Sequence, residues 1–391
     1  MTPARQAAAL ACILGTLLPP SAARAIEQPG TTAASILQVP MGSRALGMGG
    51  AFTGVADDVS ALHYNPAGLS LLKAHEISAA FLSGQTDTSS QHFAYGGPIP
   101  FSGLAGEGFS SVGGSILYSR GGQIEVNELG ADGAVQRSDT ISAGYDVVAS
   151  AGYAERIGMT PIETPGKTYN INHFLGVAAK LIHSSLAERY SATAAAADAG
   201  YLAQCPDLGV SLGFSAVNLG NKLRYVEAND PLPAAARMGV SYLYKPKPTH
   251  EVLLAADGDF LFNDRLWHTA LGMEYFWNKM FGFRLGWQFN RQTLGLTAGL
   301  GVAWRKRFTF DYAWAAGASG NSHRITFGYR FGGIVQSSRG RTRRPFVEIS
   351  PGQESMPANA EVVPIEEKPR KKPRPAPPQD VRPSGVPGWI Y

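Results

Sequence analysis

The strongest constraint in this sequence is a regular alternation of apolar with small or polar residues between about 208 and 331. The segment 281–289, for example, reads FGFRLGWQF, with an aromatic or aliphatic side chain at every second position. A period of two places alternate side chains on opposite faces of a β-strand. Segments of about 9 to 11 residues recur through this region, a length that crosses a bilayer when the strand is tilted.

The two faces of these segments have different compositions. One face is apolar, with aromatic residues at its ends, whereas the other is rich in Gly, Ser and Ala with one or two charges per segment. A soluble β-sandwich or lipocalin-like barrel would carry many more charges outside, but only 16% of the chain is charged and 46 of its 391 residues are glycine. The pattern therefore favours an all-β transmembrane antiparallel β-barrel of 12 to 16 strands, with lipid outside and a polar lumen.

The segments before residue 208 alternate less regularly. Candidate strands there are 75–83, 91–97, 113–121, 123–129, 138–146, 147–157 and 173–184. The polyalanine stretch 192–197 would be helical by propensity. Because it lies between alternating segments, we expect it to be strand or loop.

The N-terminus has the form of an export signal. Arg5 precedes the apolar run 7–18, and Ala23 and Ala25 form an A-x-A cleavage site, so residues 1–25 are predicted to be a cleaved signal peptide. No later run of 18 apolar residues predicts a transmembrane helix. After cleavage Cys205 would be the lone cysteine, which we expect to be buried or lipid-facing. These features predict export to a Gram-negative type of outer membrane.

The C-terminal segment 334–391 is rich in proline and basic residues, and 368–378 reads KPRKKPRPAPP. Such a segment builds no core and is expected to be a disordered periplasmic tail. It is either a solvated tether or a basic arm for peptidoglycan, acidic lipid or a periplasmic partner. The segment 26–333 has a formal charge of −2, which argues against a nucleic-acid partner.

Residues 36–72 do not alternate. Their glycines permit tight turns and close backbone contacts, and Asn65-Pro66 fits a helix start. The pair Asp57-Asp58 supplies too few ligands for Ca²⁺ and is expected to form a salt bridge or a cap. We expect residues 26–72 to form a hatch inside the barrel 73–333. The motif residues of this hatch are Gly42, Arg44, Gly47, Gly49, Gly50, Asp57, Asp58, Asn65, Pro66 and Gly68.

The motif GSRALGMGGA at 42–51, followed by Asp57-Asp58 and by NPAGL at 65–69, resembles the PorV/PorQ-like family of outer-membrane proteins. That family is related in fold to FadL-type transporters of long-chain fatty acids. The shorter motifs at 217–220, 231–233 and 323–333 resemble the same family, and the resemblance covers roughly 36–333. It implies a 14-stranded barrel with an N-terminal hatch. FadL-like members move hydrophobic molecules, whereas PorV-like members are partners of a secretion machine.

A lipid-facing apolar surface would turn the charged residues of the strands into the lumen, because a charge facing lipid costs about 2–4 kcal/mol. The predicted lumen residues are Lys180, Arg237, Asp257, His268, Glu274, Arg284, Arg307, Asp311, Arg324 and Arg330. They form either an ion-pair network that holds the hatch or a pathway in which arginine meets a ligand carboxylate. The last strand, with Ile325, Phe327, Tyr329 and Phe331, is expected to close the barrel.

No sequence motif indicates an enzyme, a metal site or a cofactor. The leading prediction is an outer-membrane barrel for uptake or binding of hydrophobic or amphipathic small molecules through a hatch-gated lumen. The alternative is a non-enzymatic scaffold for protein secretion or surface anchoring, and an open diffusion porin comes third. The expected partners are outer-membrane lipid and either a hydrophobic ligand or a secretion-system protein.

Overall fold

The computed structural model describes residues 32–84, 87–108, 110–129, 135–225, 229–289, 295–317 and 320–332. The predicted signal peptide with Ala23 and Ala25, and the predicted tail 334–391, lie outside these residues and stay predictions. No helix within the described ranges is long and apolar enough to span a bilayer.

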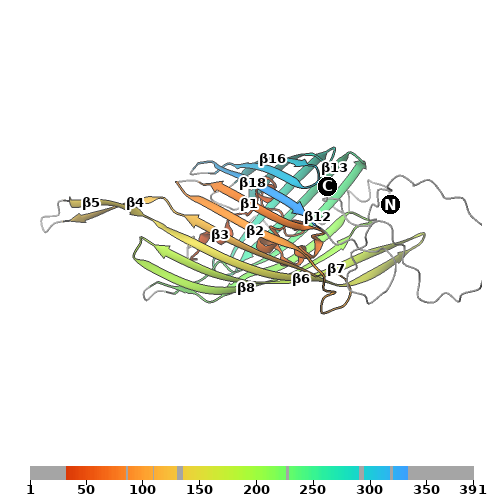
Figure 1. The fold of residues 1–391 in the computed structure, drawn as a ribbon, viewed down its shortest axis with the longest axis horizontal. Coiled ribbons are helices and arrows are strands. Elements are labelled where there is room, and N and C mark those ends of the chain that lie inside the picture. Colours follow the sequence, from red (N-terminus) through yellow and green to blue (C-terminus); the bar gives the residue numbers. More distant parts are fainter. Residues whose placement is uncertain are drawn as a thin grey trace, which may run out of the picture.

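Fourteen strands of the described residues form one closed antiparallel barrel, in the order β1-β18-β17-β16-β15-β14-β13-β12-β9-β8-β7-β6-β3-β2 (Figure 1). These strands are β1 (His75–Ser83), β2 (Ser89–Ile99), β3 (Ser110–Arg120), β6 (Gly144–Thr164), β7 (Lys167–Leu186), β8 (Tyr190–Cys205), β9 (Val210–Gly220), β12 (Ala235–Lys247), β13 (His250–Leu261), β14 (Leu266–Trp277), β15 (Phe281–Phe289), β16 (Leu296–Trp304), β17 (Phe308–Ala315) and β18 (Ser322–Phe331). The predicted fold class is confirmed, and closure removes the free sheet edge that a bilayer would not tolerate.

β18 closes the barrel against β1, with His75 opposite Phe331 and Ser83 opposite His323. Both ends of the barrel chain therefore lie at one rim, which we call the short-turn end because turns such as 165–166 and 305–307 connect its strands. The opposite rim, the loop end, carries the longer connections. In outer-membrane barrels short turns face the periplasm and longer loops face outward.

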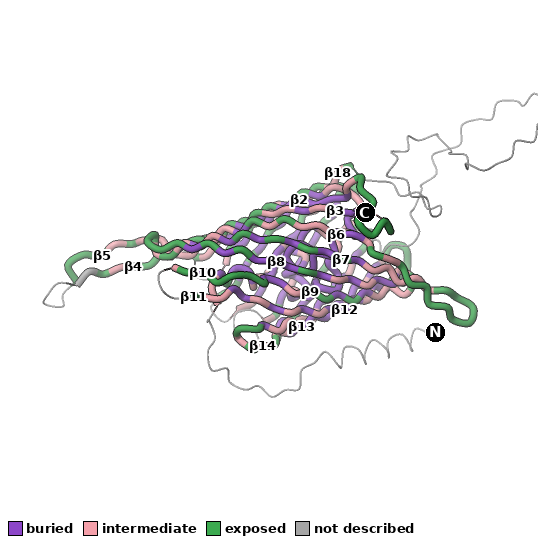
Figure 2. The backbone as a smooth tube through the Cα atoms, turned by 90° about the horizontal axis from the view of Figure 1, so that it is seen from below, coloured by how far each residue is buried: buried purple, intermediate pink, exposed green. Residues whose placement is uncertain are grey.

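The residues that alternate in the sequence lie alternately on the outer surface and on the inner surface of the barrel. Along β15, Phe281, Phe283, Leu285, Trp287 and Phe289 are exposed on the outer surface, whereas the residues between them are buried. Figure 2 shows the same alternation of buried and exposed residues along the strands that form the body of the barrel. The outer surface is thus an apolar band with aromatic residues near both rims, as expected of a barrel in lipid.

Several early elements differ from the sequence-based expectation. The segment 123–129 is β4 (Gln123–Leu129), but it pairs with β5 (Val135–Ser142) in a separate two-stranded sheet that projects beyond the loop end (Figure 1). The predicted break at 146–147 is wrong, because β6 runs without interruption from Gly144. β6 and β7 are 21 and 20 residues long, well beyond the expected 9 to 11. The polyalanine stretch is strand, within β8. A second small sheet pairs β10 (Leu223–Arg224) with β11 (Asn229–Asp230).

Candidate functional site

The segment before β1 forms a plug of short helices within the barrel, which we call the hatch (residues 32–72). Its elements are η1 (Ser35–Gln38), α2 (Ser43–Gly47), α3 (Ala61–Tyr64) and η2 (Pro66–Leu71). Figure 1 shows these coils enclosed by the strands. Leu37, Met48, Phe52 and Leu69 are almost fully buried, in apolar clusters that they share with wall residues such as Leu253 and Ala178.

Asn65 begins η2 as the sequence suggests, and it also ties the hatch to the wall. Its side-chain oxygen accepts a hydrogen bond from the amide of Ala67 at 3.2 Å, with Pro66 at the first helical position. Its Nδ2 donates to the carbonyls of Thr53 and of Tyr201 on β8, at 3.1 and 3.0 Å. One amide therefore caps a 3₁₀ helix, fastens a hatch loop and contacts a barrel strand.

Inward-facing glycines line the wall where the hatch touches it. A Cβ on Gly213 would lie 2.1 Å from the carbonyl oxygen of Thr53, and one on Gly286 would lie 2.1 Å from the amide nitrogen of Gly49. Wall glycines in contact with hatch atoms are Gly96, Gly113, Gly152, Gly176, Gly200, Gly213, Gly239, Gly272, Gly286 and Gly299. They come from ten different strands, so we call this set the glycine ring. Without side chains there, hatch backbone can lie directly against strand backbone.

The hatch glycines serve the same close approach. Gly42, Gly49 and Gly50 have φ values of 77°, 69° and 82°, which L-residues rarely adopt. A Cβ on Gly47 would lie 3.1 Å from the Cα of Gly299, and one on Gly68 would lie 1.9 Å from the carbonyl oxygen of Ala56. These positions require glycine for conformation, for space or for both.

Arg44 connects the hatch to the wall through a buried ion-pair network, which we call the Arg44 latch. Its Nη1 lies 2.5 Å from Asp57 Oδ1 and 3.2 Å from Asp58 Oδ2, both within the hatch. Its Nε and Nη2 donate to Glu274 of β14, at 3.1 and 3.0 Å. Glu274 is fully buried and also accepts from Arg284 Nε at 2.7 Å. The expected salt bridge of Asp57-Asp58 is therefore made with Arg44.

The charged groups of the latch are largely buried, and burial shifts the pKa values of Arg44 and Asp57. Burial raises the pKa of Asp57 to about 6, although Arg44 acts in the opposite direction. The pKa of Arg44 is raised well above its usual value: burial lowers it, but the surrounding carboxylates outweigh that effect. Arg44 therefore keeps its charge, while the charge of Asp57 depends on pH in the physiological range.

Other wall side chains hold the hatch backbone. Asp257 accepts hydrogen bonds from the amides of Phe52 and Thr53 at 2.8 and 2.6 Å. Gln288 donates to the carbonyl of Gly49 at 2.5 Å, and Arg324 donates to the carbonyl of Pro40. Each of these contacts joins a polar wall side chain to hatch backbone.

The predicted lumen residues are mostly inside. Lys180, Arg237, Asp257, Glu274, Arg284, Asp311 and Arg324 are buried, and His268 and Arg330 are half-buried on the lumen side. Most of them pair with each other or with the hatch, as in the 2.6 Å contact of Arg284 Nη1 with Asp311. Arg307 is the exception. It lies in the turn between β16 and β17 and is exposed, so its predicted inward position is wrong: the turn ends the alternation before it.

Lys180 belongs to a separate buried pair between strands of the wall. Its Nζ lies 2.7 Å from Asp198 of β8 and donates to Asn218 Oδ1 at 2.7 Å. Asn218 has a φ of 59° and lies where the register of β8 with β9 shifts. The group fills the lumen side of an irregular part of the wall.

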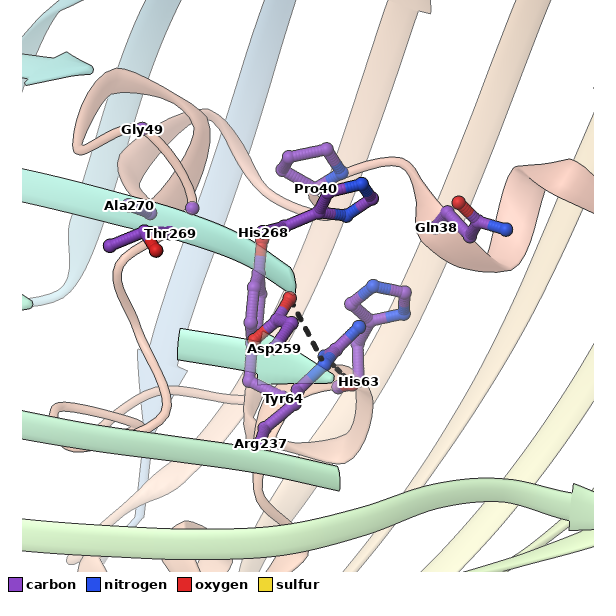
Figure 3. Close-up of a pocket in the computed structure, with 11 residues that line it drawn as sticks. Gln38, Pro40, Gly49, His63, Tyr64, Arg237, Asp259, His268, Thr269 and Ala270 are labelled. Carbon is purple, nitrogen blue, oxygen red and sulfur yellow. Dashed lines mark hydrogen bonds and ion pairs between the residues drawn. The ribbon is translucent and has the colours of Figure 1, made fainter. Parts of the chain in front are cut away.

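Two small cavities lie beside the hatch in the described part of the chain. One, of about 60 Å³, lies against strand residues of the short-turn half and is lined by polar side chains such as Arg44, Glu76 and Arg330. The other, of about 10 Å³, lies nearer the loop end between His63, Arg237, Asp259 and His268 (Figure 3). A benzene-sized ligand needs a cavity of about 150 Å³, so both suit water only.

An apolar cluster lies inside the barrel toward the loop end. Leu117, Val148 and Ile182 face inward from β3, β6 and β7, and they are at most 4% exposed. Ala192, Ala194 and Ala196 extend this surface along β8. Ile36 and Leu37 of η1 and Leu223 of β10 belong to the same cluster of buried side chains. We call this surface the apolar mouth.

The glycine ring and the apolar mouth were not predicted from the sequence. The Gly- and Ala-rich inner face was visible in the alternation, but the glycines that meet the hatch are identified only by contacts across the lumen. The described residues thus form a closed 14-stranded barrel whose lumen is occupied by an N-terminal hatch.

Comparisons with known proteins give likenesses of fold alone. No protein-family model matches the chain, and no curated protein matches it. Similar solved structures include the Ralstonia pickettii toluene transporter TbuX, at 15% identity and a TM-score of 0.48, over 74% of this chain and 98% of that chain. The Pseudomonas putida toluene transporter TodX is 11% identical, with a TM-score of 0.46. The match covers 73% of this chain and 96% of TodX. A Pseudomonas aeruginosa FadL homologue is 10% identical, with a TM-score of 0.40, over 74% and 98%. The PorV/PorQ resemblance finds no support.

Proposed function

We propose that this protein is an outer-membrane channel for uptake of hydrophobic or amphipathic small molecules, gated by the hatch. The observation that carries this proposal is the contrast between the two surfaces around the hatch. Polar side chains and glycine backbone hold the hatch, and water can replace such contacts, whereas the apolar mouth offers a hydrophobic surface toward the loop end. An apolar molecule gains free energy by leaving water for such a surface.

In this proposal a ligand enters from the loop end and displaces η1 from the apolar mouth. Movement of the hatch then breaks the Arg44 latch and opens a path along the polar side of the lumen. The cavity beside Arg44 and Arg330 lies on that path toward the short-turn end. In the described state the hatch occupies the lumen, and neither of these two cavities is large enough for a ligand such as benzene.

The proposal is tested by joining the hatch to the barrel wall through a disulfide. Ser43 Oγ of α2 lies 2.7 Å from Thr326 Oγ1 of β18, so a disulfide in the variant S43C/T326C joins hatch to wall with little movement. All variants carry C205A. Uptake of labelled toluene, which the names of TbuX and TodX suggest as a probe, and of a labelled long-chain fatty acid is measured in Gram-negative cells bearing the protein.

We expect oxidised S43C/T326C to lose uptake of any probe that the unlocked protein transports, and reduction to restore it. The matched control is S90C/S119C, which joins the neighbouring strands β2 and β3, where the two hydroxyls lie 2.9 Å apart. This control should transport in both redox states. Equal uptake by the locked and reduced hatch variant would refute gating by hatch movement.

The two alternative functions, an open diffusion porin and a scaffold for secretion or surface anchoring, receive less support. An open diffusion porin needs a water-filled lumen, and the hatch occupies this one. No observation in the fold or the comparisons favours a scaffold for a secretion system. A role of the tail 334–391 in binding peptidoglycan or a periplasmic partner remains an expectation from its sequence.

A further inference from the structure

Charge is distributed unevenly around the short-turn end of the barrel. The segments 244–251, 277–281 and 304–308 connect β12 to β13, β14 to β15 and β16 to β17, which are consecutive around the wall. Together they contain six basic residues and one carboxylate, Glu251. The basic residues, which we call the basic rim, are Lys245, Lys247, Lys279, Arg305, Lys306 and Arg307. All six are exposed.

The opposite side of the same end has the reverse balance. The segments 100–108, 163–168 and 205–209 contain Glu107, Glu163 and Asp207 but only one basic residue, Lys167. Lys167 lies 3.8 Å from Asp207 and is thereby paired. The positive charge is therefore a property of one arc and not of the whole rim.

The single carboxylate of the basic arc does not cancel its charge. Glu251 is almost fully buried and lies 3.1 Å from Lys245 Nζ and 3.9 Å from Lys279 Nζ. It holds two of the ammonium groups at the rim. Lys247 and the three basic residues of the turn 305–307 have no carboxylate partner among the contacts described.

The basic rim adjoins the lipid-facing aromatic residues of the same strands. Trp277 and Phe281 stack with ring centroids 5.7 Å apart, and Trp304 lies 5.9 Å from Phe308. Both tryptophans are about half exposed on the outer surface. The guanidinium of Arg305 lies 4.7 Å from the centre of the Trp304 ring, on the outside of the barrel. Tryptophan at a barrel rim lies at the level of lipid headgroups.

We propose that the basic rim is a binding site for the headgroup phosphates of anionic phospholipids in the periplasmic leaflet. Positive side chains next to interfacial tryptophans are placed at the depth of the phosphate. A protein or polymer ligand would not require Arg305 to lie against the lipid-facing ring of Trp304. This inference rests on the bilayer placement in the proposed function but not on transport.

The test measures lipid preference with the tryptophans of the rim. The protein, with Trp267, Trp287, Trp314 and Trp389 changed to Phe, is reconstituted in vesicles of phosphatidylcholine and phosphatidylglycerol in which one or the other lipid is brominated. Bromine quenches the emission of Trp277 and Trp304 when its lipid is adjacent. A single Lys or Arg near an anionic membrane surface corresponds to a preference of about fivefold. We expect at least this preference for phosphatidylglycerol, decreasing as salt is raised.

The variant K279N/R305N/K306N removes three rim charges. These positions have φ values of 50° to 58°, and asparagine tolerates this conformation, so the turns are retained. We expect its preference for phosphatidylglycerol to fall at least about fivefold below that of the wild type. The matched control, R189Q/K222Q/R265N, neutralises three exposed cations at the loop end and should keep the wild-type preference.

Each outcome is decisive. Equal quenching of the wild type by the two brominated lipids, an unchanged preference in the rim variant or an equal loss in the control would overturn the rim proposal. Absence of quenching by either lipid would overturn the bilayer placement itself. Where the four Phe replacements prevent folding, native mass spectrometry of the unmodified tryptophan protein counts retained phosphatidylglycerol in wild type, rim variant and control, with the same expected order.

Discussion

Single glycines decide how closely the hatch and the wall approach each other. Gly49 combines a left-handed backbone with contact to β15 and β14: a Cβ there would lie 2.9 Å from the amide nitrogen of Trp287 and 3.0 Å from the carbonyl oxygen of Leu271. Gly106, in the turn between β2 and β3, has the same kind of backbone at φ 67° with nothing within 4 Å of a Cβ. A comparison of substitutions at Gly49 and Gly106 therefore separates the cost of backbone strain from the cost of lost hatch packing.

We expect Gly49→Val to destabilise the docked hatch by about 2–4 kcal/mol, from backbone strain and overpacking together. Its conductance in a planar bilayer should exceed that of the wild type. Gly106→Val should lose about 1–2 kcal/mol, from backbone strain alone, with wild-type conductance. A Gly49→Val channel as silent as the control would show that the hatch does not seal the lumen.

Asp57 makes hatch docking depend on pH. Its pKa is about 6 in the docked hatch and 3.8 in water, so docking binds a proton between these values. The docked state is therefore stabilised as pH falls through 6 and loses this contribution as pH rises. The charged groups around Asp57 are Arg44, Asp58 and Glu274.

Thermal unfolding and channel opening measured from pH 5 to pH 8 should show this dependence. We expect opening of the wild type to increase as pH rises through about 6. Asp57→Asn imitates the neutral carboxyl and should open with a weaker pH dependence. The same slope in the wild type and in the Asp57→Asn variant would assign the pH dependence to another group.

At the scale of elements, the hatch is a small folded unit whose position is set by the strands around it. Its helices have four to six residues each, too short to be stable alone in water. Packing against the glycine ring and the Arg44 latch therefore determine their conformation. Loss of the latch should release the hatch while leaving the closed strand pairing of the barrel in place.

Glu274→Gln tests this dependence. It leaves two buried guanidinium groups with one carboxylate fewer, and breaking a buried ion pair costs about 3–5 kcal/mol. We expect a corresponding loss of unfolding free energy in urea and higher conductance. Asp139→Asn breaks the exposed 2.7 Å pair with Arg137 in the β4–β5 hairpin and should change neither quantity. Equal stability of the two variants would contradict a structural role of the latch.

At the scale of the whole molecule, the apolar side chains of the strands lie outside and the charges lie inside. This is the arrangement that a bilayer favours. Leu285 lies in the middle of β15 and Phe281 at its short-turn end, both on the outer surface. A charge facing lipid costs most at the midplane.

Leu285→Arg should therefore reduce the unfolding free energy in lipid vesicles by about 2–4 kcal/mol, and Phe281→Arg by about 0–1 kcal/mol. In detergent micelles the difference between the variants should shrink. Equal costs at the two positions in vesicles would contradict the proposed position of the barrel in the membrane.

The amino-acid pattern was enough to predict the strand type, the two faces of the wall and the position of a hatch before the barrel. These follow from local rules: a period of two separates the faces, and Gly-Gly and Asn-Pro mark a compact irregular segment. The same rules placed nine of the ten predicted lumen residues correctly, but they missed other buried strand charges, namely Glu76, Glu155, Asp198 and Glu251. They failed at Arg307, because alternation does not show where a turn interrupts a strand.

The contacts between distant residues could not be predicted from the pattern. Arg44 pairs with Glu274, 230 residues further along the chain, and ten glycines on ten strands face the hatch together. Such contacts depend on the register and closure of the whole barrel, which no local pattern contains. The departure of β4 and β5 from the barrel has the same origin, since alternation fixes the faces of a strand but not its neighbour.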